Sequence, residues 1–172
     1  MSYGLLVIRL VLGGTMAAHG AQKLFGWFGG PGPQGTAGFL SELGFGAAPL
    51  LAFALGTAEL GGGLMLALGL ATPFAAFLIA VVMVTAVATV HWKNGFFATS
   101  GGYEFNLLIY AACVGFAAMG PGRLSIDSAA SLAGSISGLW WGVGVLGASL
   151  LAGLATVELG RLGRRRWRTL PA

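Results

Sequence analysis

The sequence has few charged residues, and this shortage excludes a water-soluble globular domain. Charged residues make up 8% of the 172 positions, against 56% hydrophobic residues and 31 glycines. Soluble domains carry about 25% charged residues, so this composition predicts a chain for which the bilayer is the solvent. A chain of this length also leaves no room for a separate soluble catalytic domain beside its membrane segments. Any chemistry is therefore expected within or next to the membrane.

Cysteine and histidine are almost absent, which excludes several kinds of redox and metal chemistry. The single cysteine, Cys113, lies in an apolar run, so the chain alone forms no internal disulfide, and this residue is expected to serve packing. The two histidines, His19 and His91, belong to no HExxH or closely spaced carboxylate–histidine motif, so no metal site is predicted. No glycine-rich stretch follows a predicted strand, so nucleotide-binding fingerprints are absent as well. Redox work would need a partner or a diffusible ligand, and no covalently bound cofactor is expected.

Long apolar runs are abundant, and they predict an all-α, polytopic bundle of transmembrane helices. A helix that crosses a bilayer needs about 20 apolar residues. Five runs approach this length, at residues 4–24, 50–70, 74–91, 104–119 and 138–159. The stretch 25–49 is rich in glycine and aromatic residues. We expect it to lie on or dip into the membrane interface, with a short helix at 36–43.

Basic residues near the ends of the spans predict the orientation of the chain in the cell membrane. With five spans, Lys23, Lys93 and the arginines of the C-terminal tail share one side, and Arg123 faces the other. Because basic residues favour the cytoplasmic side, the C-terminus is expected in the cytoplasm; a re-entrant 25–49 segment would change this parity. The tail is expected to touch anionic lipid headgroups rather than nucleic acid. Its arginines are Arg161, Arg164, Arg165, Arg166 and Arg168.

Ionisable side chains inside the predicted spans are the first candidates for function. Each costs about 2.5–3.5 kcal/mol at the centre of a membrane helix, so a chain that keeps several usually pairs or uses them. Glu59 lies at the midpoint of the second predicted span and Arg9 part way into the first, and a structural ion pair between them is the simplest interpretation. On the first predicted span, Arg9, His19 and Lys23 fall within an arc of about 80° and form one polar helix face.

The inner ends of three predicted spans are expected to meet at one membrane interface. There His19 and Lys23 would approach His91, Lys93 and Glu104. Such a cluster could relay protons or bind the polar head of a lipid-soluble ligand such as a quinone, because imidazole changes charge near neutral pH. The alternative is interfacial anchoring, in which the lysines reach the headgroups and His91 belongs to an aromatic belt.

Several motifs, taken in order, resemble the DoxX family of small membrane proteins. Residues 9–14 read RLVLGG and residues 19–24 read HGAQKL, followed by ELGG at 59–62, LG at 68–69 and Thr72. The match continues through His91, NGF at 94–96, GYE at 102–104 and GPGRLSID at 120–127. The resemblance covers about residues 5–130.

The resemblance implies a four-helix membrane bundle that serves as an oxidoreductase component. Some relatives form membrane subunits of a thiosulfate-oxidising, quinone-reducing enzyme, and others associate with enzymes of thiol oxidative stress. On this basis we expect residues 1–130 to form the family core and residues 131–172 to add a fifth transmembrane helix with an arginine-rich cytoplasmic tail. The motif positions of the family are occupied here by His19, Lys23, Glu59, Glu104 and Asp127.

Three functions remain open at this point. The first is the membrane component of a quinone-linked or thiol/sulfur-linked redox system, an oxidoreductase subunit that acts with a quinone and a partner protein, with the chain's own catalytic part left open. The second is a non-catalytic scaffold that docks a soluble enzyme through residues 25–49 and 120–137, and the third is a small transporter. Gly138 and Gly142 allow close helix contact, and an oligomer is compatible with each function.

For the redox hypothesis, the predicted proton-handling residues are Glu59, His19 and Glu104, and the predicted ligand-binding residues are Arg9, Lys23, His91 and Asp127.

Overall fold

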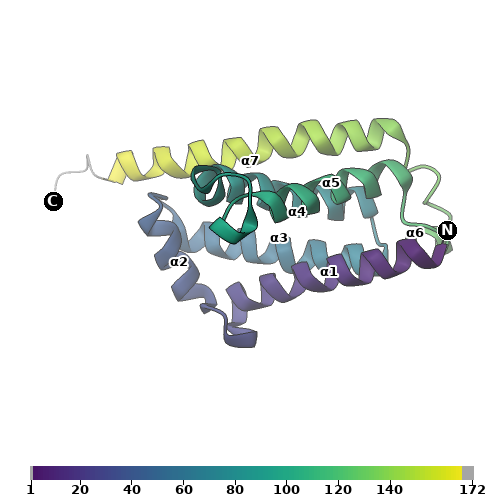
Figure 1. Ribbon diagram of the computed structural model, residues 1–172, viewed down its shortest axis with the longest axis horizontal. Helices are drawn as coiled ribbons and strands as arrows, with labels where there is room; N and C mark the ends of the chain where they lie inside the picture. Colours follow the sequence, from purple (N-terminus) through teal and green to yellow (C-terminus); the bar gives the residue numbers. More distant parts are fainter. Residues whose placement is uncertain (1, 168–172) are drawn as a thin grey trace.

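The computed structural model describes the backbone of residues 2–167 and the side chains of residues 3–162. Over this range the chain forms five long helices that run alternately in opposite directions, and it contains no strand (Figure 1). The predicted all-α bundle is confirmed. The long helices are α1 (Ser2–Phe25), α3 (Ala48–Leu68), α4 (Thr72–Ala86), α5 (Glu104–Met119) and α7 (Leu139–Trp167). The short helices are α2 (Gly32–Glu42) and α6 (Ile126–Ala129).

Four helices in the described range are long and apolar enough to cross a membrane. They comprise Tyr3–Phe25, Ala48–Leu68, Thr72–Asn94 and Leu139–Leu162. The fourth predicted span corresponds to α5, which has 16 residues. At 1.5 Å per residue, α5 is about 24 Å long, shorter than the ~30 Å hydrocarbon core of a bilayer. The described part of the chain therefore combines four helices of spanning length with one shorter apolar helix, rather than five of equal length.

The predicted boundaries agree with the helices to within a few residues, with three differences. Helix α7 ends at Trp167 rather than at about residue 159. Helix α2 begins at Gly32 rather than at residue 36, because Pro33 fits in the first turn of a helix, where its missing N–H needs no partner. The third predicted span does not end as a regular α-helix but in a π-helical turn, Val87–His91. Of the predicted arginine-rich tail, Arg161 falls among the described side chains, and the others lie outside them: Arg164, Arg165, Arg166 and Arg168.

Glycines bring α1 and α3 into backbone contact. A Cβ atom at Gly13 would lie 2.5 Å from the carbonyl oxygen of Gly63, and one at Gly20 would overlap the backbone nitrogen of Leu60. Neither position has room for a side chain, and small residues of this kind let membrane helices approach closely. The contact fixes an antiparallel register in which the end of α1 lies beside the middle of α3.

Helix α4 lies at the centre of the bundle, where it packs against α3, α5 and α7. Its residues Ala76 and Ile79 are fully buried, and they join Met16 of α1, Leu66 of α3 and Cys113 of α5 in one apolar core. Cys113 therefore serves packing, as predicted.

The connections divide the bundle into two ends (Figure 1). One end holds α2, the segment 92–103 and the C-terminal part of α7, and Lys23 and Lys93 lie there. The other end holds the start of α1, the α3–α4 turn and α6. We call the former the lysine end and the latter the α6 end.

Candidate functional site

An ion pair between a buried carboxylate and a partly exposed ammonium group joins α1 and α3 near the lysine end. The ammonium group of Lys23, in the last turn of α1, donates to carboxylate oxygen Oε1 of Glu59 in the middle of α3. Glu59 is 3% exposed, whereas 28% of the Lys23 side chain is accessible. The expected ion pair between Glu59 and Arg9 is wrong, because the register of α1 and α3 sets Lys23 opposite Glu59. Arg9 lies 14 residues earlier on α1, which is about 21 Å along the helix axis.

The second carboxylate oxygen of Glu59, Oε2, is buried and has no hydrogen-bond partner in the described part of the chain. His19 lies one turn before Lys23 on α1. A buried carboxylate oxygen without a donor is costly, since most buried polar groups are satisfied by hydrogen bonds. The group of Lys23, Glu59 and His19 therefore combines a fixed ion pair with a free acceptor position.

Arg9 lies at the α6 end, where it is fully buried. Its guanidinium group donates from Nη2 to the carbonyl oxygen of Leu124, while Nε and Nη1 have no partner among the described residues. The residue that ends α3, Gly69, must be glycine for two reasons. Its φ is 65°, in the left-handed region, and a Cβ atom there would overlap the guanidinium group of Arg9. Arg9 thus connects α1 to the α3–α4 turn and to the segment before α6.

Asp127, in the first turn of α6, caps the beginning of α4. Its carboxylate accepts three hydrogen bonds, from the N–H of Ala71 at 2.7 Å, the N–H of Thr72 at 2.9 Å and the Thr72 hydroxyl at 2.7 Å. Negative charge is favourable at this position because the helix dipole is positive at its N-terminus. All three donors belong to the chain itself, so the capping of α4 is a sufficient structural reason for a carboxylate at residue 127. The ligand-binding roles of Arg9 and Asp127 stay predictions.

His91 and Glu104 stabilise the segment that connects α4 to α5. The Nδ1 atom of His91 lies 2.7 Å from the carbonyl oxygen of Gly101, and Glu104 accepts a hydrogen bond of 2.9 Å from the N–H of Ala98. In the part of the chain that the structure describes, no hydrogen bond or ion pair joins His91 or Glu104 to His19 or to the Lys23–Glu59 pair. The cluster expected from His19, Lys23, His91, Lys93 and Glu104 is therefore not joined by contacts among the described residues, and Lys23 pairs instead with Glu59, which was not expected there.

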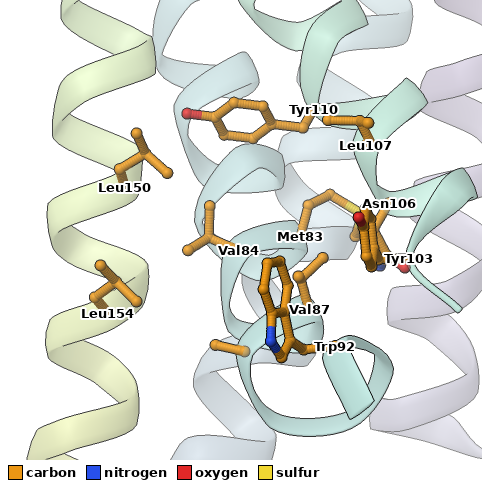
Figure 2. Close-up of a pocket in the computed structure, with 11 residues that line it drawn as sticks. Met83, Val84, Val87, Trp92, Tyr103, Asn106, Leu107, Tyr110, Leu150 and Leu154 are labelled. Carbon is orange, nitrogen blue, oxygen red and sulfur yellow. The ribbon is translucent and has the colours of Figure 1, made fainter. Parts of the chain in front are cut away.

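A groove of about 500 Å³ lies near the lysine end on the side formed by α4, α5 and α7 (Figure 2). Its walls are almost entirely apolar. Trp92 and Tyr103 stack on each other at one end of it, with ring centroids 5.4 Å apart and planes 16° from parallel. The lining residues are Met83, Val84, Val87, Ala88, Trp92, Tyr103, Asn106, Leu107, Tyr110, Leu150 and Leu154.

Two local features give the groove its shape. At the π-helical turn Val87–His91 each backbone N–H bonds one residue farther back than in an α-helix, and such turns occur frequently at functional sites. Across the groove, the Tyr110 hydroxyl donates a hydrogen bond of 2.8 Å to the carbonyl oxygen of Leu146, which ties α5 to α7. The groove is therefore bounded by Trp92 toward the lysine end and by Tyr110 toward the bundle centre (Figure 2).

Sequence reasoning did not find the groove, because its lining comes from four separate segments and is mostly apolar. The available signal is His91 beside Trp92, which indicates only an aromatic belt at the membrane interface. No group of three or more His, Cys, Asp or Glu side chains lies together within the part of the chain that the structure describes.

Comparisons with known proteins bear on the family and, more weakly, on the chemistry. The model of the DoxX family matches residues 4–92, just over half of the chain. A relative from Bacillus subtilis (strain 168), named "Putative oxidoreductase CatD", is 29% identical over 124 residues, which cover 72% of this chain and 84% of that protein. No solved structure matches.

Proposed function

The chain belongs to the DoxX family of membrane proteins, and we propose that it is the membrane component of a redox system that works with a quinone. The observation that carries the proposal is the Lys23–Glu59 pair, in which the second carboxylate oxygen of Glu59 is buried and has no partner among the described residues. The name of the relative, an oxidoreductase, agrees with a redox role.

Proton exchange is the reason to retain such a pair inside a membrane protein. Replacing a buried ion pair by apolar residues is often neutral or stabilising by about 1–4 kcal/mol, so stability alone does not favour it. Reduction of a quinone to a hydroquinone takes up two electrons and two protons, and an intramembrane carboxylate beside an imidazole supplies a path for those protons. In this proposal Glu59 and His19 handle protons, and Lys23 holds the carboxylate in place. Glu104, at the same end of the bundle, is the third proton-handling candidate.

Electrons come from outside the chain. Its single cysteine, Cys113, is buried in the core and has no second thiol with which to form a disulfide. We therefore propose a thiol or sulfur compound, or a soluble redox enzyme, as the donor at the membrane surface.

The lysine end is the side on which a soluble donor would meet the protein. In the proposed orientation this end faces the cytoplasm of the cell, because Lys23, Lys93 and the end of α7 lie there and basic residues favour the cytoplasmic side. A reporter fused after residue 172 tests the orientation: activity of a cytoplasm-dependent reporter is expected, and activity of one that needs export would contradict it.

Docking of a soluble enzyme without intramembrane chemistry is the second candidate. Exposed aromatic side chains at the lysine end favour it, since Trp27 is 58% and Phe28 74% exposed. Under this function, substitutions at these two residues would abolish partner capture and Glu59→Gln would leave activity unchanged. Under the redox function this ranking is reversed.

Quinone retention tests the proposal. The protein is purified in mild detergent from its native membrane and extracted with organic solvent, and quinone is quantified per mole of protein. An unrelated helical membrane protein, purified in the same way with matched lipid, gives the background. Retention several-fold above this background is expected; retention equal to it would remove the main support for a quinone-linked function.

A further inference from the structure

The groove between α4, α5 and α7 contains no charged side chain in its lining (Figure 2). Its volume of about 500 Å³ lies in the range of about 300–1,000 Å³ that ligand sites in proteins occupy. An uncharged lining does not suit the headgroup of a phospholipid, which would bring a phosphate into it without a cation. The groove suits an uncharged molecule of lipophilic character.

Asn106 supplies a polar group within these apolar walls. In the described part of the chain its side-chain amide makes one hydrogen bond, to the sulfur of Met83 at 3.5 Å. A thioether sulfur is a weak acceptor, so the amide keeps donor capacity for a better one. In the low dielectric of a membrane interior an amide gains much from such an acceptor. A carbonyl oxygen of a ligand would satisfy it.

Trp92 and Tyr103 form an aromatic platform at the lysine end of the groove. Because Tyr103 covers one face of the indole, and Trp92 as a whole is 68% exposed, the other indole face is open. Figure 2 shows the indole of Trp92 extending along the groove toward Val87. Aromatic rings prefer offset stacking on such a face, and a pair contributes about 0.5–1.5 kcal/mol beyond the area that it buries.

From these three features we infer that the groove binds the planar, uncharged ring of a lipophilic carbonyl compound. The ring stacks on Trp92, a ring carbonyl accepts from the Asn106 amide, and an apolar tail runs along Leu150 and Leu154 toward the lipid. The inference rests on the proposed function, since a quinone has this chemistry, and it deepens that function by assigning the ring to a site apart from the Lys23–Glu59 pair, which then exchanges protons with the quinone by way of the lysine end and not by direct contact. A lipid acyl chain, the other apolar occupant, would use neither the amide nor the platform.

Two probes of the same size separate the contributions of ring and carbonyl. Menadione and 2-methylnaphthalene share a fused ring and a methyl group, and menadione alone carries carbonyl oxygens. Binding is measured by equilibrium dialysis against nanodiscs that contain the protein, with empty nanodiscs to subtract partition into lipid. Wild-type protein is expected to bind menadione about 5–10-fold more tightly than 2-methylnaphthalene, the preference that one hydrogen bond of about 1–1.4 kcal/mol gives.

Three variants locate the binding site. Asn106→Leu keeps the approximate size of the side chain and is expected to abolish the preference for menadione. Leu150→Trp fills the groove and is expected to weaken both probes more than tenfold. Leu151→Trp, one residue along α7, is the matched control, because Leu151 is 74% exposed and does not line the groove. It should leave both affinities unchanged, and size-exclusion profiles confirm that each variant folds.

The outcomes separate this inference from the proposed function. Saturable menadione binding that survives both Leu150→Trp and Asn106→Leu overturns the groove as the ring site and leaves the quinone-linked function standing. Loss of affinity in Leu150→Trp with equal wild-type binding of the two probes overturns the carbonyl contact and indicates a general apolar site. Absence of saturable binding to the wild type overturns both proposals.

Discussion

Replacing Asp127 by alanine should destabilise the bundle by about 3–5 kcal/mol, because its carboxylate holds the start of α4 to α6. Three hydrogen bonds to a buried charged group are lost, and bonds of this kind contribute about 1.5–3 kcal/mol each. The Thr72 hydroxyl can turn to another acceptor, so the total is smaller than the sum. The backbone N–H groups of Ala71 and Thr72 remain without that acceptor.

The free energy of unfolding is measured by titration with a denaturing detergent in mild micelles, followed by tryptophan fluorescence. Asp127→Asn keeps one acceptor oxygen and should cost about half as much as Asp127→Ala. Glu158→Ala, at an exposed position on α7, should change the unfolding free energy by less than about 0.5 kcal/mol. An Asp127→Ala variant within about 1 kcal/mol of the wild type would refute the assigned role of this carboxylate as the cap of α4.

Three further substitutions test the packing and the ion pair. Gly20→Ala should destabilise the protein by at least about 2 kcal/mol, since the new Cβ atom would overlap α3. The control Gly14→Ala, whose Cβ atom meets open space, should change the unfolding free energy by less than about 0.5 kcal/mol in the same titration. Tyr110→Phe should cost about 1 kcal/mol by removing the hydrogen bond between α5 and α7, and an unchanged midpoint would contradict that bond. Glu59→Leu alone should destabilise the protein by about 3–5 kcal/mol, because it leaves Lys23 unpaired. The double variant with Lys23→Met should recover most of this loss. Failure of the recovery would show that Lys23 and Glu59 do not act as a pair.

The helices could be predicted from sequence because lipid imposes a length and a composition on them. Each apolar run had to end where glycine or polar residues follow, and Gly69 and Gly120, both at positive φ, end α3 and α5 close to the predicted positions. The ionisable residues were also identifiable, since charge inside an apolar run is conspicuous. These predictions need only local information.

The pairing of those residues could not be predicted in the same way. Whether Glu59 meets Arg9 or Lys23 depends on how far α1 is shifted along α3, and that shift is set by backbone contacts at Gly13 and Gly20. The depth of each residue in its own predicted span favours Arg9 and contains no information on this shift. The groove was missed for a related reason: it depends on a π-helical turn and on the approach of α5 to α7, neither of which leaves a periodic pattern.

The central claim, a quinone-linked redox role that uses Glu59, is tested most directly by the rate of quinone reduction. Dithiothreitol serves as the donor and duroquinone as the acceptor, because thiols do not add to its fully substituted ring; the dithiol becomes a disulfide and the quinone a hydroquinone. Wild-type protein in nanodiscs should exceed empty nanodiscs, and Glu59→Gln should lower the protein-dependent rate at least about tenfold, as expected for loss of a proton-transfer group. The control Glu158→Gln should match the wild type. A Glu59→Gln rate equal to that of the wild type would contradict the central claim, and a wild-type rate equal to that of empty nanodiscs would exclude a small dithiol as the donor.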